Sequence, residues 1–155
     1  MIKYVNYDIV FQEFPDEVTL AINLSLCPNA CPGCHSSYLA GDIGDELTPT
    51  RLFSLIDDVY PNITCVALMG GDNDPDEVSR LLKMVKEHEV YDLNTGWYSG
   101  KNKLPDNFDP SAFDYVKVGP YIAERGPLKS KTTNQRLYRL SGGKMEDITF
   151  RFWKA

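Results

Sequence analysis

Short strand-like segments that alternate with helical ones constrain the fold of this chain most. Residues 18–25 alternate polar and apolar side chains, and residues 63–69 form the continuous apolar run of a buried strand. Residues 92–98 and 114–118 indicate two more strands. Apolar side chains at helical spacing follow Thr48-Pro49 and Asp74-Pro75, which are typical helix starts. This βα order predicts a parallel sheet with right-handed crossovers.

Further β-structure is expected at both ends of the chain. Residues 2–14 are rich in β-branched and aromatic side chains, which favours one or two strands. Residues 137–140 and 148–153 flank Ser-Gly-Gly-Lys and predict a terminal β-hairpin. The chain has 155 residues, whereas a complete eightfold βα barrel needs roughly 250. We therefore expect a single α/β domain over residues 1–155, either a partial, open barrel or a small parallel sheet.

Three of the four cysteines lie together, directly after the strand predicted at 18–25. Cys27, Cys31 and Cys34 have the spacing C-x3-C-x2-C. The N-terminus lacks a signal-peptide pattern and no run of 18 apolar residues occurs, so a cytoplasmic protein without membrane spans is expected. The net charge of −6 disfavours nucleic acid as a partner. In a reducing compartment such a cluster indicates metal ligands or catalysis rather than disulfides.

The identity of the metal depends on the fourth ligand. A structural zinc site needs four, but His35 is adjacent to Cys34, and adjacent side chains diverge. His88 follows a predicted helix, where solvent exposure is expected, and Cys65 lies in an apolar run typical of a core. In a 4Fe–4S cluster, three thiolates leave one iron without a protein ligand and open to chemistry.

The second predicted strand ends in Met69-Gly70-Gly71-Asp72, and this motif together with the cysteine spacing resembles the radical S-adenosylmethionine (SAM) superfamily. The resemblance implies a partial, open βα barrel of the radical SAM type with a C-terminal β-hairpin. It implies that the three cysteines bind a 4Fe–4S cluster, whose open iron takes SAM, and that reductive cleavage of SAM gives a radical that abstracts hydrogen. Gly70, Gly71 and Asp72 would bind the SAM amino group. The chain departs from the superfamily pattern in three places. Asp72 lies where glutamate is usual, and the proline that usually follows this acidic residue is displaced to Pro75. Gly33 lies where an aromatic residue is common.

Later motifs narrow the resemblance. Residues 97–100, 118–122, 125–128 and 132–136 are similar in order and spacing to the activating proteins of anaerobic ribonucleoside-triphosphate reductase, over about residues 8–153. This family implies a glycyl radical formed on the large reductase subunit, with an electron from flavodoxin or ferredoxin. No catalytic residue is implied beyond the cluster and the SAM site. Further residues expected at the SAM site are Gly33, Cys34, His35, Tyr98, Ser99 and Gly100. Asn134, Gln135 and Arg136 are expected to line the SAM rim, to dock the partner or to anchor a loop.

Two other functions remain open from the sequence. One is a different radical SAM enzyme, either an activase of another glycyl radical enzyme or a small-molecule mutase. The absence of further cysteine clusters disfavours activases that carry additional clusters. The other is a non-catalytic cysteine-rich module that binds zinc or transfers electrons.

Overall fold

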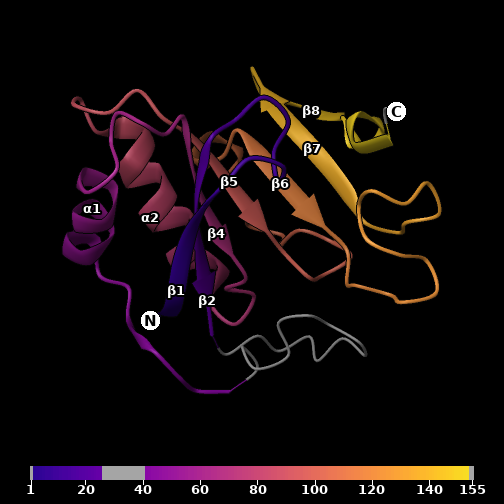
Figure 1. The fold of residues 1–155 in the computed structure, drawn as a ribbon, viewed down its shortest axis with the longest axis horizontal. Helices are drawn as coiled ribbons and strands as arrows, with labels where there is room; N and C mark the ends of the chain where they lie inside the picture. The colour runs from indigo at the N-terminus through magenta and orange to yellow at the C-terminus, as the bar shows by residue number, and fades with distance from the viewer. Residues whose placement is uncertain (1, 26–40, 154–155) are drawn as a thin grey trace.

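The computed structural model describes residues 2–25 and 41–153, and within them eight strands form one sheet (Figure 1). The strand order is β3-β1-β2-β4-β5-β6-β7-β8. The strands are β1 Lys3–Val10, β2 Thr19–Leu24, β3 Asp45–Glu46, β4 Cys65–Met69, β5 Asn94–Tyr98, β6 Tyr115–Val118, β7 Arg136–Ser141 and β8 Lys144–Asp147.

The centre of the sheet is parallel and its flanks are antiparallel. β2, β4, β5 and β6 pair in parallel, whereas β1 pairs antiparallel with β2, and β7 with β6. The expected α/β class is confirmed, and the sheet is open rather than closed into a barrel. The parallel arrangement expected of the βα strands is confirmed for β2, β4, β5 and β6, whereas β1, β3, β7 and β8 add antiparallel strands to it.

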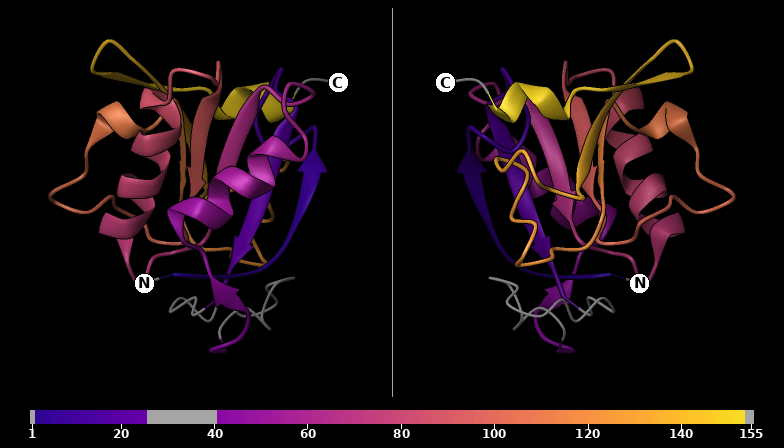
Figure 2. Two further views of the ribbon diagram at one scale, coloured as in Figure 1. Left: turned by 90° about the vertical axis from the view of Figure 1, so that its left-hand side faces the viewer. Right: turned by 90° about the vertical axis from the view of Figure 1, so that its right-hand side faces the viewer.

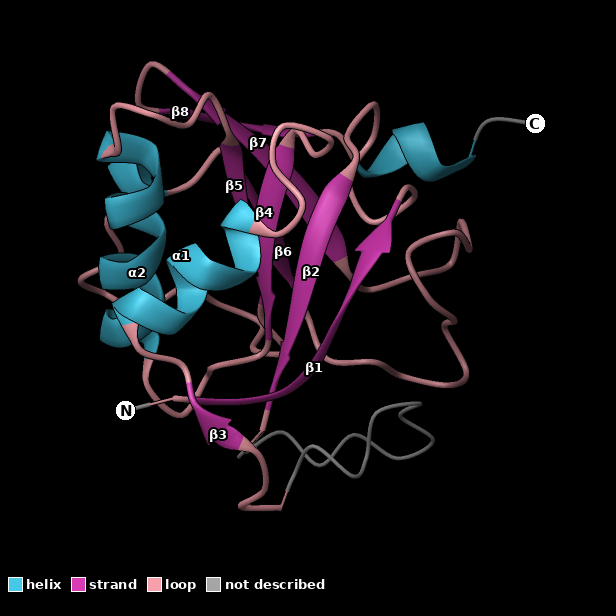
Figure 3. Ribbon diagram, turned by 60° about the vertical axis from the view of Figure 1, so that its left-hand side comes forward, coloured by secondary structure: helices cyan, strands magenta, loops and turns pink. Residues whose placement is uncertain are grey.

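Two helices cover one face of the sheet (Figure 3). α1 Pro49–Asp57 begins after Thr48, whose hydroxyl accepts a hydrogen bond from Arg51 N at 3.1 Å. α2 Pro75–Glu87 begins after Asp74, which caps Glu77 N in the same way. Both predicted helix starts are thus confirmed. The main core lies between these helices and the sheet and includes Leu20, Ile22, Leu24, Val66, Leu68, Trp97, Leu52, Ile56, Val78, Leu81 and Val85.

The other face of the sheet packs against the β1–β2 loop and C-terminal segments. A second, smaller cluster of buried side chains lies on this face. It contains Cys65, Tyr115, Ala67, Leu128, Leu137 and Ile148. Phe14 is fully buried there and stacks on Tyr115 with 4.9 Å between ring centroids. Gly96 has no room for a side chain, because a Cβ would lie 2.3 Å from the Phe14 ring. Cys65 is therefore a core residue, as predicted.

Two segments add to or differ from the predicted elements. Residues 41–47 contain β3, which pairs with Lys3 and Tyr4 of β1. The second strand of the C-terminal hairpin is β8, and the 3₁₀ helix η3 Thr149–Trp153 occupies the place of the predicted strand. Asp147 explains the difference, because its carboxylate accepts bonds from Thr149 N at 3.0 Å and Thr149 Oγ1 at 2.6 Å and so turns the chain.

A short 3₁₀ helix, η2 Pro110–Ala112, precedes β6. Figure 2 shows the β7–β8 hairpin projecting at the edge of the sheet opposite to the end of β2. In the part of the chain that the structure describes, no helix is both long and apolar enough to cross a membrane.

Candidate functional site

The candidate site lies where the four parallel strands end. β2, β4, β5 and β6 run in the same direction, so their carboxyl ends share one edge of the sheet. Gly70-Gly71-Asp72 follows β4, Ser99-Gly100 follows β5 and Gly119-Pro120 follows β6. Ligands of open α/β sheets bind outside this edge.

The turn after β4 needs its glycines. Gly70 has φ +106° and Gly71 has φ +90°, a backbone region that L side chains rarely adopt. A Cβ on Gly71 would also lie 2.6 Å from Val78 Cγ2 in α2 and 3.0 Å from Leu24 Cδ1 at the end of β2. The turn is therefore pressed between the first strand of the parallel set and the start of the second helix.

Asp72 ties this turn to the end of β5. Ser99 Oγ donates to one carboxylate oxygen at 2.6 Å, and the backbone N–H of Gly100 donates to the other at 2.8 Å. The Trp97 indole N–H donates to the carbonyl of Gly70 at 2.6 Å. The structure thus brings together Gly70, Gly71, Asp72, Ser99 and Gly100, which the sequence predicted as one site.

Tyr98 points away from this group. Neighbouring residues of a strand face opposite sides, so Tyr98 lies on the face away from the helices. Its hydroxyl donates to the backbone carbonyl of Glu13, and its ring meets Phe14 edge-on at 5.3 Å. Burial, and then the negative charge of Glu13, raise the pKa of Tyr98. The Tyr98 side chain therefore packs against the β1–β2 loop, where its hydroxyl and ring contact Glu13 and Phe14 rather than Asp72 or Ser99.

The predicted cluster ligands Cys27, Cys31 and Cys34, together with Gly33 and His35, lie outside the described residues. Their place in the chain is informative, since they follow Ser25, the residue after β2, at the edge that carries Asp72.

The described residues offer no substitute for these ligands. None of their groups of three or more His, Cys, Asp or Glu side chains could hold a metal ion. The Cys65 thiol is buried, and burial followed by the charge of Glu17 raises its pKa, so it stays a neutral thiol. His88 is half-buried rather than exposed as predicted, because its ring packs on Phe53 and Tyr91.

Asn134, Gln135 and Arg136 anchor loops. The amide of Asn134 donates to the carbonyl of Pro120 at 3.0 Å, and that of Gln135 donates to the carbonyl of Gly119 at 3.4 Å. Arg136 pairs with Asp147 of β8 at 2.8 Å. Of the three roles left open by the sequence, these contacts favour loop anchoring at the end of β6.

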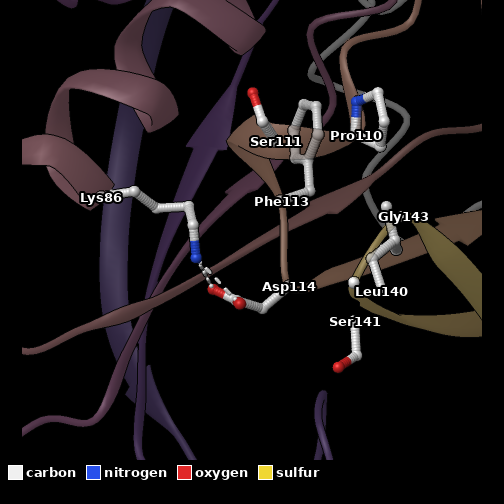
Figure 4. A pocket seen from close by; sticks show the side chains of 9 residues that line it. Lys86, Pro110, Ser111, Phe113, Asp114, Leu140, Ser141 and Gly143 are labelled. Atoms are coloured by element: carbon white, nitrogen blue, oxygen red, sulfur yellow. Dashed lines mark hydrogen bonds and ion pairs between the residues drawn. The ribbon is translucent and has the colours of Figure 1, made fainter.

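The opposite edge of the sheet carries features that sequence reasoning missed. A cavity of about 390 Å³ lies between α2, η2 and the β7–β8 turn. Figure 4 shows the side chains that line it. Lys86 of α2 spans it to Asp114 at 2.8 Å, so the two charges neutralise each other. Near this edge the buried Glu17 carboxylate accepts bonds from Thr64, Asn94 and Tyr115. No local sequence pattern signals these long-range contacts.

The Asp72 carboxylate, held by the donors Ser99 and Gly100, supplies acceptor chemistry of the kind that an ammonium group binds. Comparisons of the chain with protein-family models, curated proteins and solved structures find no match. The inference of function therefore rests on the residues of this chain.

Proposed function

We propose that the chain is a radical SAM protein that activates anaerobic ribonucleoside-triphosphate reductase by generating its glycyl radical. The observation that carries this proposal is the contact of the Gly70–Asp72 turn with Ser99 and Gly100 beside the end of β2. The chain runs from β2 directly into the segment with the three clustered cysteines. The cysteine segment thus starts at the sheet edge that also carries the proposed amino-group acceptor.

In this proposal each group has a defined role. Cys27, Cys31 and Cys34 would hold a 4Fe–4S cluster, and Asp72 would hold the SAM amino group. Once bound, the two cofactors supply reductive SAM cleavage and hydrogen abstraction, with the electron delivered by flavodoxin or ferredoxin. The donors Ser99 and Gly100 fix the Asp72 carboxylate before any ligand arrives, and such preorganisation favours binding.

The open sheet suits a protein substrate. The proposal takes β2, β4, β5 and β6 as the core of a partial, open βα barrel of the radical SAM type. Because the sheet is not closed, a loop of the large reductase subunit can approach the carboxyl edge from the side. The proposal also makes this a cytoplasmic protein, since its substrate and electron donors are expected there.

Anaerobic reconstitution with iron and sulfide tests the proposal. We expect about four irons per chain, formation of 5′-deoxyadenosine from SAM under reduction, and a glycyl radical signal in electron paramagnetic resonance of a co-incubated reductase. Cys27→Ala, Cys31→Ala and Cys34→Ala should each lose the cluster. Cys65→Ala is the matched control and should keep it, because Cys65 is fully buried in the core.

Each contrary outcome has a distinct meaning. Bound zinc without iron, and no spectral response to SAM, would contradict the proposal and favour a zinc module. SAM cleavage without a radical on the reductase would retain the radical SAM class and refute this partner. Loss of iron in Cys65→Ala would refute the assignment of the three-cysteine site.

A further inference from the structure

Residues 125–145 concentrate positive charge in an acidic chain. They contain six Lys and Arg residues and no Asp or Glu, whereas the whole chain has a net charge of −6. The rest of the chain holds the other ten basic residues and all 22 acidic ones, which gives it a net charge of −12. Such a block of one sign favours contact with a partner of the opposite charge.

Half of this positive charge lies in the loop between β6 and β7. The structure describes all of this loop, residues 119–135, and it contains neither helix nor strand. Connections of this length without secondary structure are uncommon in compact domains and are often functional. Both ends of the loop lie at the carboxyl edge of the parallel strands, because β7 runs antiparallel to β6. Figure 1 shows the loop, in orange, extending beyond these strands on the side away from α1 and α2.

The β6–β7 loop is held in one conformation by contacts along its length. Leu128 is 7% exposed and packs in the second core cluster. The carbonyl of Leu128 accepts a hydrogen bond from the Trp153 indole N–H at 2.9 Å. Thr132 Oγ1 donates to the carbonyl of Arg125 at 2.7 Å and so closes the middle of the loop. A loop ordered in this way loses little conformational entropy when a partner binds.

Three cations of the loop are exposed and are not neutralised by neighbouring acids. Arg125, Lys129 and Lys131 are all exposed. Within residues 2–25 and 41–153 none of the three forms an ion pair with a carboxylate. Lys129 Nζ donates instead to the neutral side-chain oxygen of Gln12 at 2.6 Å. The positive potential of the loop therefore remains available to a partner.

The composition of this surface suits a brief electrostatic encounter rather than a permanent interface. Among the large apolar side chains of the loop only Ile122 is exposed, at 36%. Permanent interfaces are large and apolar at their centre, which this loop does not provide. Complexes between electron-transfer proteins are smaller, and complementary charge mainly increases their rate of association.

We propose that the β6–β7 loop docks an acidic electron-carrier protein through Arg125, Lys129 and Lys131. This inference rests on the proposed function, in which such a protein supplies the electron. In the docked complex the carrier is oxidised by one electron and the oxidised cluster is reduced by it, and no bond or proton is transferred. The ends of β2 and β6 are three inter-strand spacings apart, about 14 Å. A protein docked on the loop can span that distance to the start of the cysteine segment after Ser25.

Stopped-flow measurement of cluster reduction, without SAM, tests the proposal on the reconstituted protein. The probe is reduced flavodoxin of net negative charge, and the signal is the loss of cluster absorbance. The triple variant Arg125→Gln, Lys129→Gln, Lys131→Gln should lower the second-order rate constant about 10-fold at low ionic strength, because steering charges are lost. In about 0.5 M salt the wild type and the variant should react at similar rates, since exposed charges are then screened.

Lys131→Glu and Lys144→Glu form a matched pair of single variants. Both lysines are exposed and both substitutions change the net charge equally, but Lys144 begins β8 in the hairpin at the opposite edge (Figure 2). Lys131→Glu should slow reduction by flavodoxin several-fold, whereas Lys144→Glu should react as the wild type does. Photoreduced deazaflavin is a small reductant that needs no docking surface, so it should reduce the cluster of every variant at the wild-type rate.

The outcomes separate this inference from the proposed function. Equal rate constants of the triple variant and the wild type with flavodoxin would refute the inference alone. Equal slowing by Lys131→Glu and Lys144→Glu would also refute it, because the effect would then follow net charge rather than this loop. Slower reduction of the triple variant by deazaflavin as well would indicate structural damage and count against docking. A wild type that binds no iron, or whose cluster neither reductant reduces, would refute the proposed function and the inference with it.

Discussion

Removal of the Glu17 carboxylate should destabilise the sheet at its amino edge. Glu17 is 9% exposed. Its carboxylate accepts bonds from Thr64 Oγ1 at 2.6 Å, Asn94 Nδ2 at 2.8 Å and the Tyr115 hydroxyl at 2.8 Å. Thr64 Oγ1 in turn accepts from Val18 N at 2.9 Å. One side chain thus connects the starts of the four parallel strands.

The magnitude follows from these bonds. A hydrogen bond to a charged acceptor contributes about 1.5–3 kcal/mol, and loss of the carboxylate relieves part of its own burial cost. For Glu17→Ala we expect a net loss of about 2–4 kcal/mol, because the buried Tyr115 hydroxyl and the half-buried Asn94 amide lose their acceptor, whereas the exposed Thr64 hydroxyl can bond to water. This corresponds to a decrease in Tm of about 4–16 °C for a chain of this length. Glu17→Gln keeps one acceptor oxygen and should lose about 1–2 kcal/mol.

Urea unfolding followed by circular dichroism measures the effect. The slope against urea concentration should stay constant while the midpoint falls, which indicates a change in stability alone. Glu89→Ala is the control, because Glu89 is exposed and such substitutions change stability by about 0.5 kcal/mol or less. A loss below about 1 kcal/mol for Glu17→Ala would refute the view that this carboxylate holds the strands together.

Two further predictions concern the glycine turn and alkaline pH. Gly71→Ala should cost about 2–4 kcal/mol in urea unfolding, because strain at φ +90° adds to the 2.6 Å approach to Val78. Gly143→Ala has a similar φ of +80° but open space around it, so a loss of about 1–2 kcal/mol is expected, and equal losses would refute the packing argument. Burial, with the bond to Asp57, raises the pKa of Tyr91 to about 12. Its stabilising contribution is therefore full below the unfolded pKa of about 10 and is lost as pH rises toward 12. Tyr91→Phe should lessen the fall of the urea midpoint between about pH 10 and pH 12. If the midpoint of Tyr91→Phe falls with pH as steeply as that of the wild type, Tyr91 is not the group that titrates.

Local chemistry explains what the sequence predicted well. The helix starts follow from Thr48-Pro49 and Asp74-Pro75, where a capping side chain precedes a residue that needs no N–H bond. The polar turn after β4 was predictable because a buried apolar run ends there in two glycines and an aspartate. These features depend on residues adjacent in the chain.

Errors arose where composition concealed a local turn or where the alternation of side chains along a strand was not applied. Residues 148–153 have the composition of a strand, but Asp147 turns the chain and the segment forms η3. Tyr98 and Ser99 were grouped as sequence neighbours, although strand geometry sends them to opposite faces. Lys117 is a single charge inside an apolar run, and only the structure shows that it is buried and donates to the carbonyl of Gly119.

The pairing of β1 has a consequence for the entropy of the cysteine segment. Tyr4 is opposite both Leu24 of β2 and Asp45 of β3. One residue of β1 therefore fixes the start and the end of the segment that connects β2 to β3. Closing a loop of about twenty residues costs roughly 2–3 kcal/mol of conformational free energy. In this protein the strand pairing of the sheet offsets that free energy. In the proposed function, the cysteine segment therefore starts and ends at positions that one strand already fixes before any cluster binds.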